Sequence, residues 1–395
     1  MSVSPSPHYF DFNATTPLCP AARQAWQDAQ DEAWHNPSSA YRAGAAVHAR
    51  LDQTREGGGA RLGASPGRVV FNSGATEGNN GIMRHLVSQA SPDAGVLVSP
   101  LEHPSVLEPA RRLFGDRLQI LPLNAAGQVD PGALDRRLAQ SPPVALVSVM
   151  AAHNVTGIIQ PWEAIARVCR RHGVPYHCDA SQWLGKYPAD GLGDCAWVTG
   201  CAHKLGGPKG VGFILLPDED CPFGQLFGGY QQRGRRAGTE DWPNLAAFFA
   251  AWEDRQALAP DAAAADHRAA FEQALIARIP EVRILGLDTP RLWNTSAWVM
   301  PRHRNTRWIA RMDKAGFQIA GGAACSSNKD HPDDGLRALG VLSDEADRVI
   351  RVSGGWETGR EAWLALADAF GRVMTQLDQE ATSPSSGTRV IDLDD

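Results

Sequence analysis

The sequence lacks long apolar runs, paired cysteines and a signal-peptide pattern. No apolar run among the 395 residues approaches the roughly 20 residues of a membrane-spanning helix, and residues 1–12 lack the charged and apolar regions of a signal peptide. The seven cysteines include no C-x-x-C pair, so we predict neither a disulfide framework nor a zinc site. We therefore expect a cytoplasmic protein with reduced thiols and without a metal.

Basic charge is also scarce. The formal net charge is −6, and residues 378–395 hold five acidic residues against one arginine. Nucleic-acid and membrane surfaces are bound by clustered basic residues, which this balance does not provide, so we expect neither among the partners. Only five of the 38 basic residues are lysines, so each lysine can be considered individually.

Short apolar runs alternate with longer helical stretches in the first two thirds of the chain. Runs without alternating polar positions are typical of strands buried on both faces, and the stretches between them leave room for crossover helices. We predict helices in the segment after Ser73-Gly74-Ala75-Thr76-Glu77 and over 161–172. The expected strands are 68–71, 95–99, 144–150, 174–179, 195–199 and 211–216. This pattern predicts a mostly parallel α/β sheet.

The composition indicates two domains and a tail. A long helix over 244–258 leads to an alanine-rich, proline-marked stretch that we take as the boundary. Beyond it, helices mix with short strands, which is typical of an α+β domain. Residues 378–395 are polar, acidic and rich in serine and proline, so we predict a disordered tail. The predicted units are a large domain over 15–258 and a small one over 1–14 and 259–377.

Three short motifs carry candidate chemistry. Lys204 follows a predicted strand and precedes a glycine-rich turn, where burial would lower the pKa of its amine toward the nucleophilic form. Taken alone, this motif fits a surface lysine better. Asp179 ends another strand, and Ser73-Gly74-Ala75-Thr76 places small residues at a helix N-terminus suited to phosphate. A lysine, an acid and a phosphate site are what pyridoxal phosphate (PLP) needs, so together they predict that cofactor.

Ordered motifs across nearly the whole chain resemble those of the cysteine desulfurases, in the class V aminotransferase family. Among them are HNPSSAYRAG at 35–44, VVFNSGATEGNN at 69–80, HCDASQ at 177–182, CAHKLGGPKGVG at 201–212 and GGAACSS at 321–327. The resemblance implies a fold type I PLP enzyme, with a large domain of mostly parallel sheet and a smaller α+β domain. It implies removal of sulfur from L-cysteine, leaving alanine and a persulfide on Cys325 for a sulfur-acceptor protein.

The resemblance also implies a role for each site residue. Lys204 would carry PLP, Asp179 would pair with the ring nitrogen, and His103 would stack on the ring and act in catalysis. Asn154 and Gln182 would lie near the phenolic oxygen. The implied phosphate ligands are Ala75, Thr76, Cys201, His203 and, from a second subunit, Thr239. The last of these implies a homodimer.

Cys325 is the residue that separates a desulfurase from other PLP enzymes. Its small, polar neighbours Ser326, Ser327 and Asn328 predict an exposed loop, which a sulfur-accepting thiolate requires, whereas most free cysteines are buried. Two positions upstream depart from the family, since Ala151 stands for its histidine and Val155 for its glutamate.

Two further departures lie at ligand positions. Cys201 stands where the family has serine or threonine, and a thiol is the poorer donor. Trp356 stands where the resemblance places an arginine for the substrate carboxylate. Either Arg351 or an arginine of 233–236 takes over, or the substrate differs from ordinarily bound L-cysteine. The alternatives are a C–S lyase, aminotransferase or epimerase acting on another amino acid, or a PLP-binding scaffold without catalysis.

Overall fold

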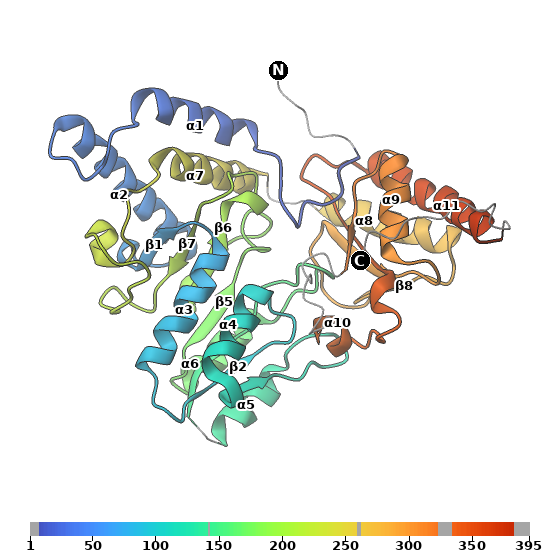
Figure 1. The fold of residues 1–395 in the computed structure, drawn as a ribbon, viewed down its shortest axis with the longest axis horizontal. Helices are drawn as coiled ribbons and strands as arrows, with labels where there is room; N and C mark the ends of the chain where they lie inside the picture. Colours follow the sequence, from blue (N-terminus) through green and yellow to red (C-terminus); the bar gives the residue numbers. More distant parts are fainter. Residues whose placement is uncertain (1–7, 141–142, 259–261, 323–333, 383–395) are drawn as a thin grey trace, which may run out of the picture.

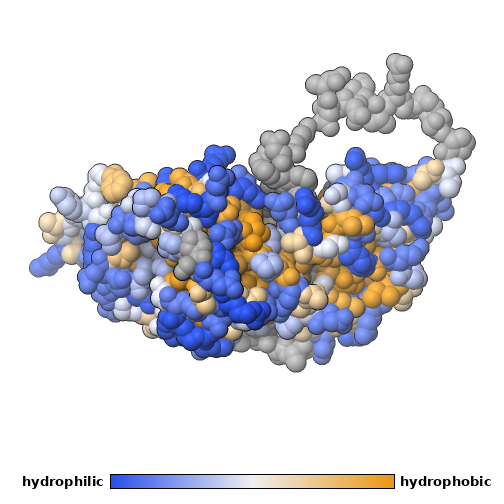
Figure 2. Space-filling model, turned by 90° about the horizontal axis from the view of Figure 1, so that it is seen from below, coloured by the Kyte–Doolittle hydropathy of each residue, from blue (hydrophilic) through white to orange (hydrophobic). Residues whose placement is uncertain are grey.

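The chain folds around two β-sheets that lie side by side, each with its own helices (Figure 1). The computed structural model describes residues 8–140, 143–258, 262–322 and 334–382. Among the described helices, none combines the length and apolar character needed to cross a bilayer. On the face in Figure 2, hydrophobic residues gather toward the middle and over the half that carries the smaller sheet.

The larger sheet has seven strands and is mostly parallel, as the sequence predicts. Strand β7 is antiparallel to both of its neighbours, and the other pairings are parallel. The short, half-exposed β3 is a strand that the sequence pattern did not indicate. In spatial order the strands are β1 (Val69–Asn72), β7 (Gly212–Leu215), β6 (Trp197–Cys201), β5 (Tyr176–Asp179), β4 (Val144–Ser148), β2 (Gly95–Val98) and β3 (Leu118–Ile120).

Helices cover both faces of this sheet, which explains why its strands have no regular polar positions. On β4, Leu146 packs into a cluster with α3 and α4, whereas Val147 packs on the opposite side with α6 and α7. Proline or a capping side chain starts several of these helices, as Asp130 does for α5. The helices are α1 (Pro20–Glu32), α2 (Arg42–Leu62), α3 (Ala75–Gln89), α4 (Pro104–Phe114), α5 (Pro131–Ala139), α6 (Trp162–Arg171) and α7 (Trp242–Ala257).

The smaller sheet has four antiparallel strands beside a separate aromatic core. Trp298, Trp308 and Trp363 are buried there together with Phe271 and Phe370. In spatial order the strands are β10 (Ala320–Gly321), β11 (Val349–Ser353), β9 (Thr295–Val299) and β8 (Arg283–Ile284). The helices are α8 (Ala262–Arg278), α9 (Asn305–Lys314), α10 (Asp334–Ala338) and α11 (Arg360–Thr382).

The predicted start of the disordered tail is wrong. Helix α11 continues through residues 378–382, because ion pairs compensate for their polar composition. Asp378 accepts from Arg302 and His303, at 2.9 and 2.8 Å. Glu380 pairs with Arg311 at 2.6 Å. The remainder of the predicted tail, 383–395, lies outside the described residues.

The N-terminal segment connects the two sheets. The Phe10 N–H donates to the Gln318 carbonyl, just before β10 of the smaller sheet. The Ser353 N–H, at the end of β11, donates to the Phe10 carbonyl. A few residues later, the Thr16 N–H donates to the carbonyl of His203, which follows strand β6 of the larger sheet. The same short segment therefore fixes the position of the 203–206 turn relative to β11.

Candidate active site

A cavity of about 640 Å³ lies at the carboxyl ends of the parallel strands β4, β5 and β6. Parallel sheets gather ligand-binding groups at this edge. Its lining includes Asp179 at the end of β5, Cys201 at the end of β6 and, from the smaller sheet, Arg351. Of the predicted site residues, those that line it are Ala75, Thr76, His103, Asn154, Asp179, Gln182, Cys201, His203 and Lys204.

Asp179 is a buried carboxylate held by directed donors. Its Oδ1 accepts from the Ser181 N–H at 2.9 Å, and its Oδ2 accepts from Asn79 Nδ2 at 3.0 Å. Burial alone would raise the pKa of Asp179, but these hydrogen bonds and the Lys204 charge outweigh it and bring the pKa below its usual range. The carboxylate is therefore ionised and suited to a cationic ring nitrogen.

Lys204 ends a short 3₁₀ turn, Ala202–Lys204, directly after β6. The glycines that follow are needed for close packing: a Cβ on Gly207 would lie 2.7 Å from the Ala202 Cβ. Gly206 has a φ of +96° and donates its N–H to Thr16 Oγ1 at 2.8 Å. The turn is thereby fixed with the Lys204 amine in the cavity.

His103 lies at the N-cap of α4 and contacts the same cavity. The Ser105 N–H donates to His103 Nδ1 at 3.1 Å, and Ser105 Oγ lies 2.8 Å from the same nitrogen. Burial and then the Lys204 charge lower the pKa of His103, against the opposing effect of Asp179. The imidazole is therefore neutral, with Nδ1 accepting and the proton on Nε2.

The N-terminus of α3 offers backbone donors to an anion. Gly74 is its N-cap with a φ of +137°, and a Cβ at this position would meet nothing within 4 Å. Ala75 and Thr76 start the helix, while Glu77 accepts from the Ser73 N–H at 2.8 Å and pairs with Arg236 at 3.1 Å. This end of the cavity fits a phosphate group.

Cys201 and His203 flank this end of the cavity as uncharged groups. Burial raises the pKa of the Cys201 thiol, so it is not a thiolate. Burial, followed by the Lys204 and Lys209 charges, lowers the pKa of His203 to about 4. Both can serve as neutral hydrogen-bonding groups.

Lys186 is a buried residue to which sequence reasoning gave no role. Its amine donates to Gln182 Oε1 at 2.6 Å and to Asn13 Oδ1 at 3.0 Å. Gln182 Nε2 in turn donates to the Asn13 carbonyl at 2.9 Å, so the orientation of the Gln182 amide is fixed. The sequence signal for it was its place in the short list of lysines, four residues after Gln182.

Arg351, one of the two substitutes considered for Trp356, is in the cavity. Its side chain is buried. Its Nη2 donates to Asp11 Oδ1 at 2.5 Å, and its Nη1 donates to the Asn154 carbonyl at 3.2 Å. Its Nε is buried and has no hydrogen-bond partner among the described residues. A cation in this position fits a carboxylate ligand.

Trp356, which stands at the position expected for the carboxylate-binding arginine, is not among the residues that line the cavity. Its indole N–H donates to the Gly185 carbonyl at 3.1 Å. The Arg255 guanidinium lies 4.2 Å from its ring centroid, and Trp293 packs edge-on against it. These contacts hold the indole in the packing between the two sheets.

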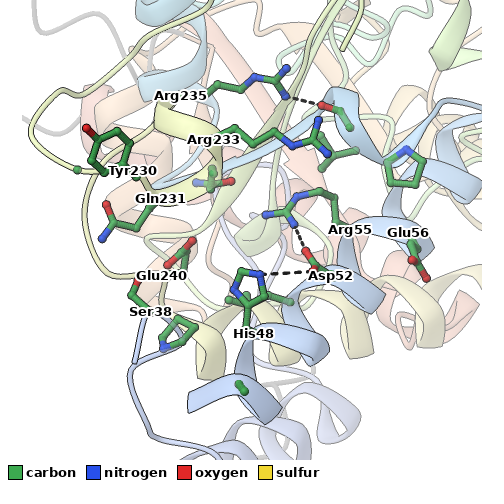
Figure 3. A pocket seen from close by; sticks show the side chains of 18 of the residues that line it. Ser38, His48, Asp52, Arg55, Glu56, Tyr230, Gln231, Arg233, Arg235 and Glu240 are labelled. Carbon is green, nitrogen blue, oxygen red and sulfur yellow. Dashed lines mark hydrogen bonds and ion pairs between the residues drawn. The ribbon is translucent and has the colours of Figure 1, made fainter. Parts of the chain in front are cut away.

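The 228–241 segment borders a second hollow of about 1120 Å³, shown in Figure 3. Arg235 donates to the Gly67 and Glu219 carbonyls, and Arg236 pairs with Glu77. Thr239 is exposed and does not line the first cavity in the same chain. The other predicted catalytic residue, Cys325, lies outside the described residues.

The fold defines the class of the protein. Its match to a NifS-like protein has a TM-score of 0.83 and 26% identity over 93% of this chain and 99% of the other. The sequence model of the aminotransferase class-V family matches residues 8–355. The chain belongs to this family, whose members use PLP.

Relatives that are similar over most of the chain are named as cysteine desulfurases. A cysteine desulfurase from Cereibacter sphaeroides is 36% identical over 361 residues, 89% of this chain and 92% of the relative. One from Nostoc sp. is 32% identical over 350 residues, 87% of each chain. A solved structure of SspA in complex with cysteine matches with a TM-score of 0.75 and 27% identity, covering 88% of this chain and 98% of the other.

Proposed function

We propose that this protein is a PLP-dependent cysteine desulfurase, which transfers sulfur from L-cysteine to Cys325 and releases alanine. The observation that carries the proposal is the ionised, buried Asp179 in one cavity with Lys204 and His103. Similarity to cysteine desulfurases over most of the chain supports the choice of substrate. When bound, PLP supplies an electron sink for a bond cleavage beside the amino group.

The residues present fit that cofactor. Lys204 would bind its aldehyde carbon, Asp179 would accept from its ring N–H, and the neutral His103 would stack on the ring. Gln182, with its amide fixed by Lys186, and Asn154 would lie near the phenolic oxygen. The proposed phosphate ligands are Ala75, Thr76, Cys201, His203 and Thr239 of a partner subunit.

We assign the substrate carboxylate to Arg351. The buried side chain lines the cavity, and its Nε–H has no hydrogen-bond partner in the part of the chain that the structure describes. Its contacts with Asp11 and the Asn154 carbonyl fix its plane, and the planar fork matches a carboxylate in a way that a lysine cannot. The proposal for L-cysteine therefore does not depend on an arginine at position 356.

A homodimer follows from Thr239. The residue is exposed in one chain, on a segment that also carries the exposed Tyr230 and Phe227. Apolar side chains exposed to this degree favour burial against a partner. A second copy would bring its Thr239 to this chain's phosphate end.

The proposal is tested by incubating the PLP-loaded protein with L-cysteine and measuring alanine, sulfide and protein-bound persulfide. We expect equal amounts of alanine and transferred sulfur, and a persulfide on Cys325 by mass spectrometry. Cys325→Ser should retain PLP but form no persulfide. Lys204→Ala should lose the borohydride-reducible link, whereas Lys209→Ala should keep it. Alanine release without persulfide, or turnover of another amino acid alone, would overturn the proposal.

A further inference from the structure

A continuous chain of buried polar side chains crosses the strands beneath the cavity. Ser148, His177 and Thr199 lie on the adjacent strands β4, β5 and β6, and each is fully buried. The chain runs from Glu102 to Asp179. Its successive contacts are Glu102 Oε1 to Ser148 Oγ (3.2 Å), Ser148 Oγ to His177 Nδ1 (2.9 Å), His177 Nε2 to Thr199 Oγ1 (3.1 Å), Thr199 Oγ1 to Asn79 Oδ1 (2.7 Å) and Asn79 Nδ2 to Asp179 Oδ2 (3.0 Å).

The hydrogens near Asp179 can be assigned by valence. Asp179 only accepts, so the Asn79 Nδ2 faces it and the Asn79 Oδ1 faces Thr199. An amide oxygen cannot donate, so the Thr199 hydroxyl gives its single hydrogen to Asn79. Thr199 Oγ1 must then accept from His177 Nε2, which therefore carries a proton.

The remaining hydrogens depend on the charge of His177. Burial lowers the pKa of His177 to about 4, so near pH 7 it is neutral and its Nδ1 accepts from the Ser148 hydroxyl. That hydroxyl has no second hydrogen for Glu102, so Glu102 must donate to Ser148. Burial and the Asp179 charge raise the pKa of Glu102 well above its usual range, against the opposing effects of its contacts with Ser148 and the Met150 backbone.

Asn79 connects this chain to both groups expected at the cofactor ring. Its Nδ2 donates to Asp179 and also to Ser105 Oγ at 2.9 Å. The Ser105 hydroxyl then donates to His103 Nδ1 at 2.8 Å. If the amide were reversed, its oxygen would face the Asp179 carboxylate and Ser105 would lose its donor.

We propose that Glu102 is a positioning residue, protonated in the folded protein, whose hydrogen is relayed through Ser148, His177 and Thr199 to fix the orientation of the Asn79 amide. The relay keeps the Asn79 amide donating to Asp179 and to the Ser105–His103 pair. Its significance for catalysis rests on the proposed function, because only then do Asp179 and His103 contact PLP. The relay itself is a property of the polypeptide.

The opposite arrangement has the same number of protons: an ionised Glu102 beside a cationic His177. The charged groups facing the pair are Asp179 and, beyond it, Lys204. Infrared spectra of the protein without and with PLP distinguish the two arrangements. We expect a protonated-carboxyl C=O band near neutral pH that disappears in Glu102→Gln. Absence of this band in the wild type would overturn the proposal.

Nitrogen-15 NMR of the histidine side chains provides the second measurement. We expect His177 as the neutral Nε2–H tautomer at pH 7, and the same tautomer in Glu102→Gln, because the glutamine amide also donates to Ser148. A His177 imidazolium in the wild type would show that Glu102 is an acceptor and would overturn the relay. Loss of the neutral Nε2–H tautomer in Glu102→Gln would overturn it as well. These readouts need no enzymatic activity.

The link to the site is tested at Thr199. Thr199→Val removes the hydroxyl that orients the Asn79 amide, so the hydrogen bond from Asn79 to the Asp179 carboxylate should weaken. We expect PLP binding to weaken about tenfold as a result. The substitution should also shift the nitrogen-15 resonance of the bound ring, whereas Thr199→Ser should restore both. Unchanged binding and resonance in a folded Thr199→Val would overturn the link. If wild-type protein binds no PLP while the infrared and histidine results hold, the proposed function fails and the relay stands.

Discussion

At the residue scale, the proposal gives Arg351 the role of holding the amino-acid carboxylate. Both of its terminal nitrogens have partners, Asp11 and the Asn154 carbonyl, so the guanidinium plane is fixed before any ligand arrives. A bidentate, charge-assisted contact adds about 1.5–3 kcal/mol of binding free energy. In the proposed site, Arg351 would take the role that the resemblance places at residue 356.

Replacing the Arg351 guanidinium with a lysine amine, which keeps the positive charge, tests this role. Arg351→Lys should raise the KM for L-cysteine roughly ten- to a hundredfold, with a smaller change in kcat, because lysine cannot hold a carboxylate with two hydrogen bonds. Steady-state kinetics measures the effect, and thermal unfolding verifies that the variant is folded. The matched variant Trp356→Phe should leave KM within about twofold. A KM unchanged in Arg351→Lys would contradict the assignment.

Introducing arginine at 356 should harm the protein rather than improve it. In Trp356→Arg a second guanidinium would replace the ring now 4.2 Å from Arg255, and the cation–π contact, about 0.5–2 kcal/mol, would be lost. We expect a lower free energy of unfolding and no gain in cysteine turnover. Urea titration and kinetics of the same preparation measure both. A gain in kcat/KM would show that residue 356 reaches the substrate after all.

Sequence reasoning found the residues whose setting is local. Asp179 and Lys204 were predicted from the strands that precede them, and the cavity brings them together. The roles of Lys186 and Asn79 were missed, because each has a partner that is distant in sequence: Lys186 donates to Asn13 as well as to the nearby Gln182, and Asn79 donates to Asp179. A buried polar residue has no recognisable pattern of its own until the fold supplies its partners.

At the scale of elements, the C-terminal turn of α11 shows how composition can mislead. Low hydrophobicity predicts disorder only when no partner compensates for it, and here Asp378 and Glu380 contact Arg302 and His303 before α9 and Arg307 and Arg311 on α9. By contrast, α3 and α6 agree with the predictions because their signals, small residues just after a strand and an early proline, are local.

The ion pairs of Asp378 should contribute measurably to stability. Asp378→Asn should lower the free energy of unfolding by about 0.5 kcal/mol after solvent screening, and less at high salt. Its pKa lies below the usual range because of His303 and Arg302, so this contribution exists near neutral pH and disappears as pH falls through that lowered pKa. Asp313→Asn, exposed on α9, is the matched control. Equal effects in the two variants would argue against the pairing.

At the scale of the molecule, buried neutral histidines make the fold sensitive to acid. Burial lowers the pKa of His153 to about 3 and that of His177 to about 4, from about 6.5 in the unfolded chain. At pH values between the folded and unfolded pKa, these histidines bind protons in the unfolded chain but stay neutral in the folded chain. The contribution of neutral burial to stability is therefore complete above about pH 6.5 and is lost as pH falls toward 4.

We expect the free energy of unfolding to fall by about 2 kcal/mol per buried histidine between pH 7 and pH 5. Urea unfolding at a series of pH values measures the slope. His153→Gln removes one of the titrating groups, so its stability should vary less steeply over this range than that of the wild type. Parallel curves for the two proteins would contradict the assignment of the slope to His153.

The proposed dimer makes a prediction about the whole assembly. Tyr230 and Phe227 are 96% and 85% exposed in the single chain, so Tyr230→Glu combined with Phe227→Glu should shift the mass in light scattering to that of a monomer. PLP should bind less tightly, because Thr239 no longer reaches a partner. Leu342→Glu, at a residue 62% exposed beside the smaller sheet, should leave the dimer intact. A monomeric wild type with full PLP occupancy would exclude this arrangement.

The contacts of the N-terminal segment can form only in a certain order while the chain is synthesised. Asn13 donates its backbone N–H to Ser353 Oγ at 2.9 Å, across 340 residues of sequence, while Thr16 contacts the turn that holds Lys204. Contacts of such long range form late in folding, since the loop between the partners must close first. The contacts of Phe10, Phe12 and Asn13 with Ser353 can therefore form only after β11 has left the exit tunnel. Nascent chains stopped before Ser353 should form the Thr16 contact with the lysine turn but lack this attachment to β11.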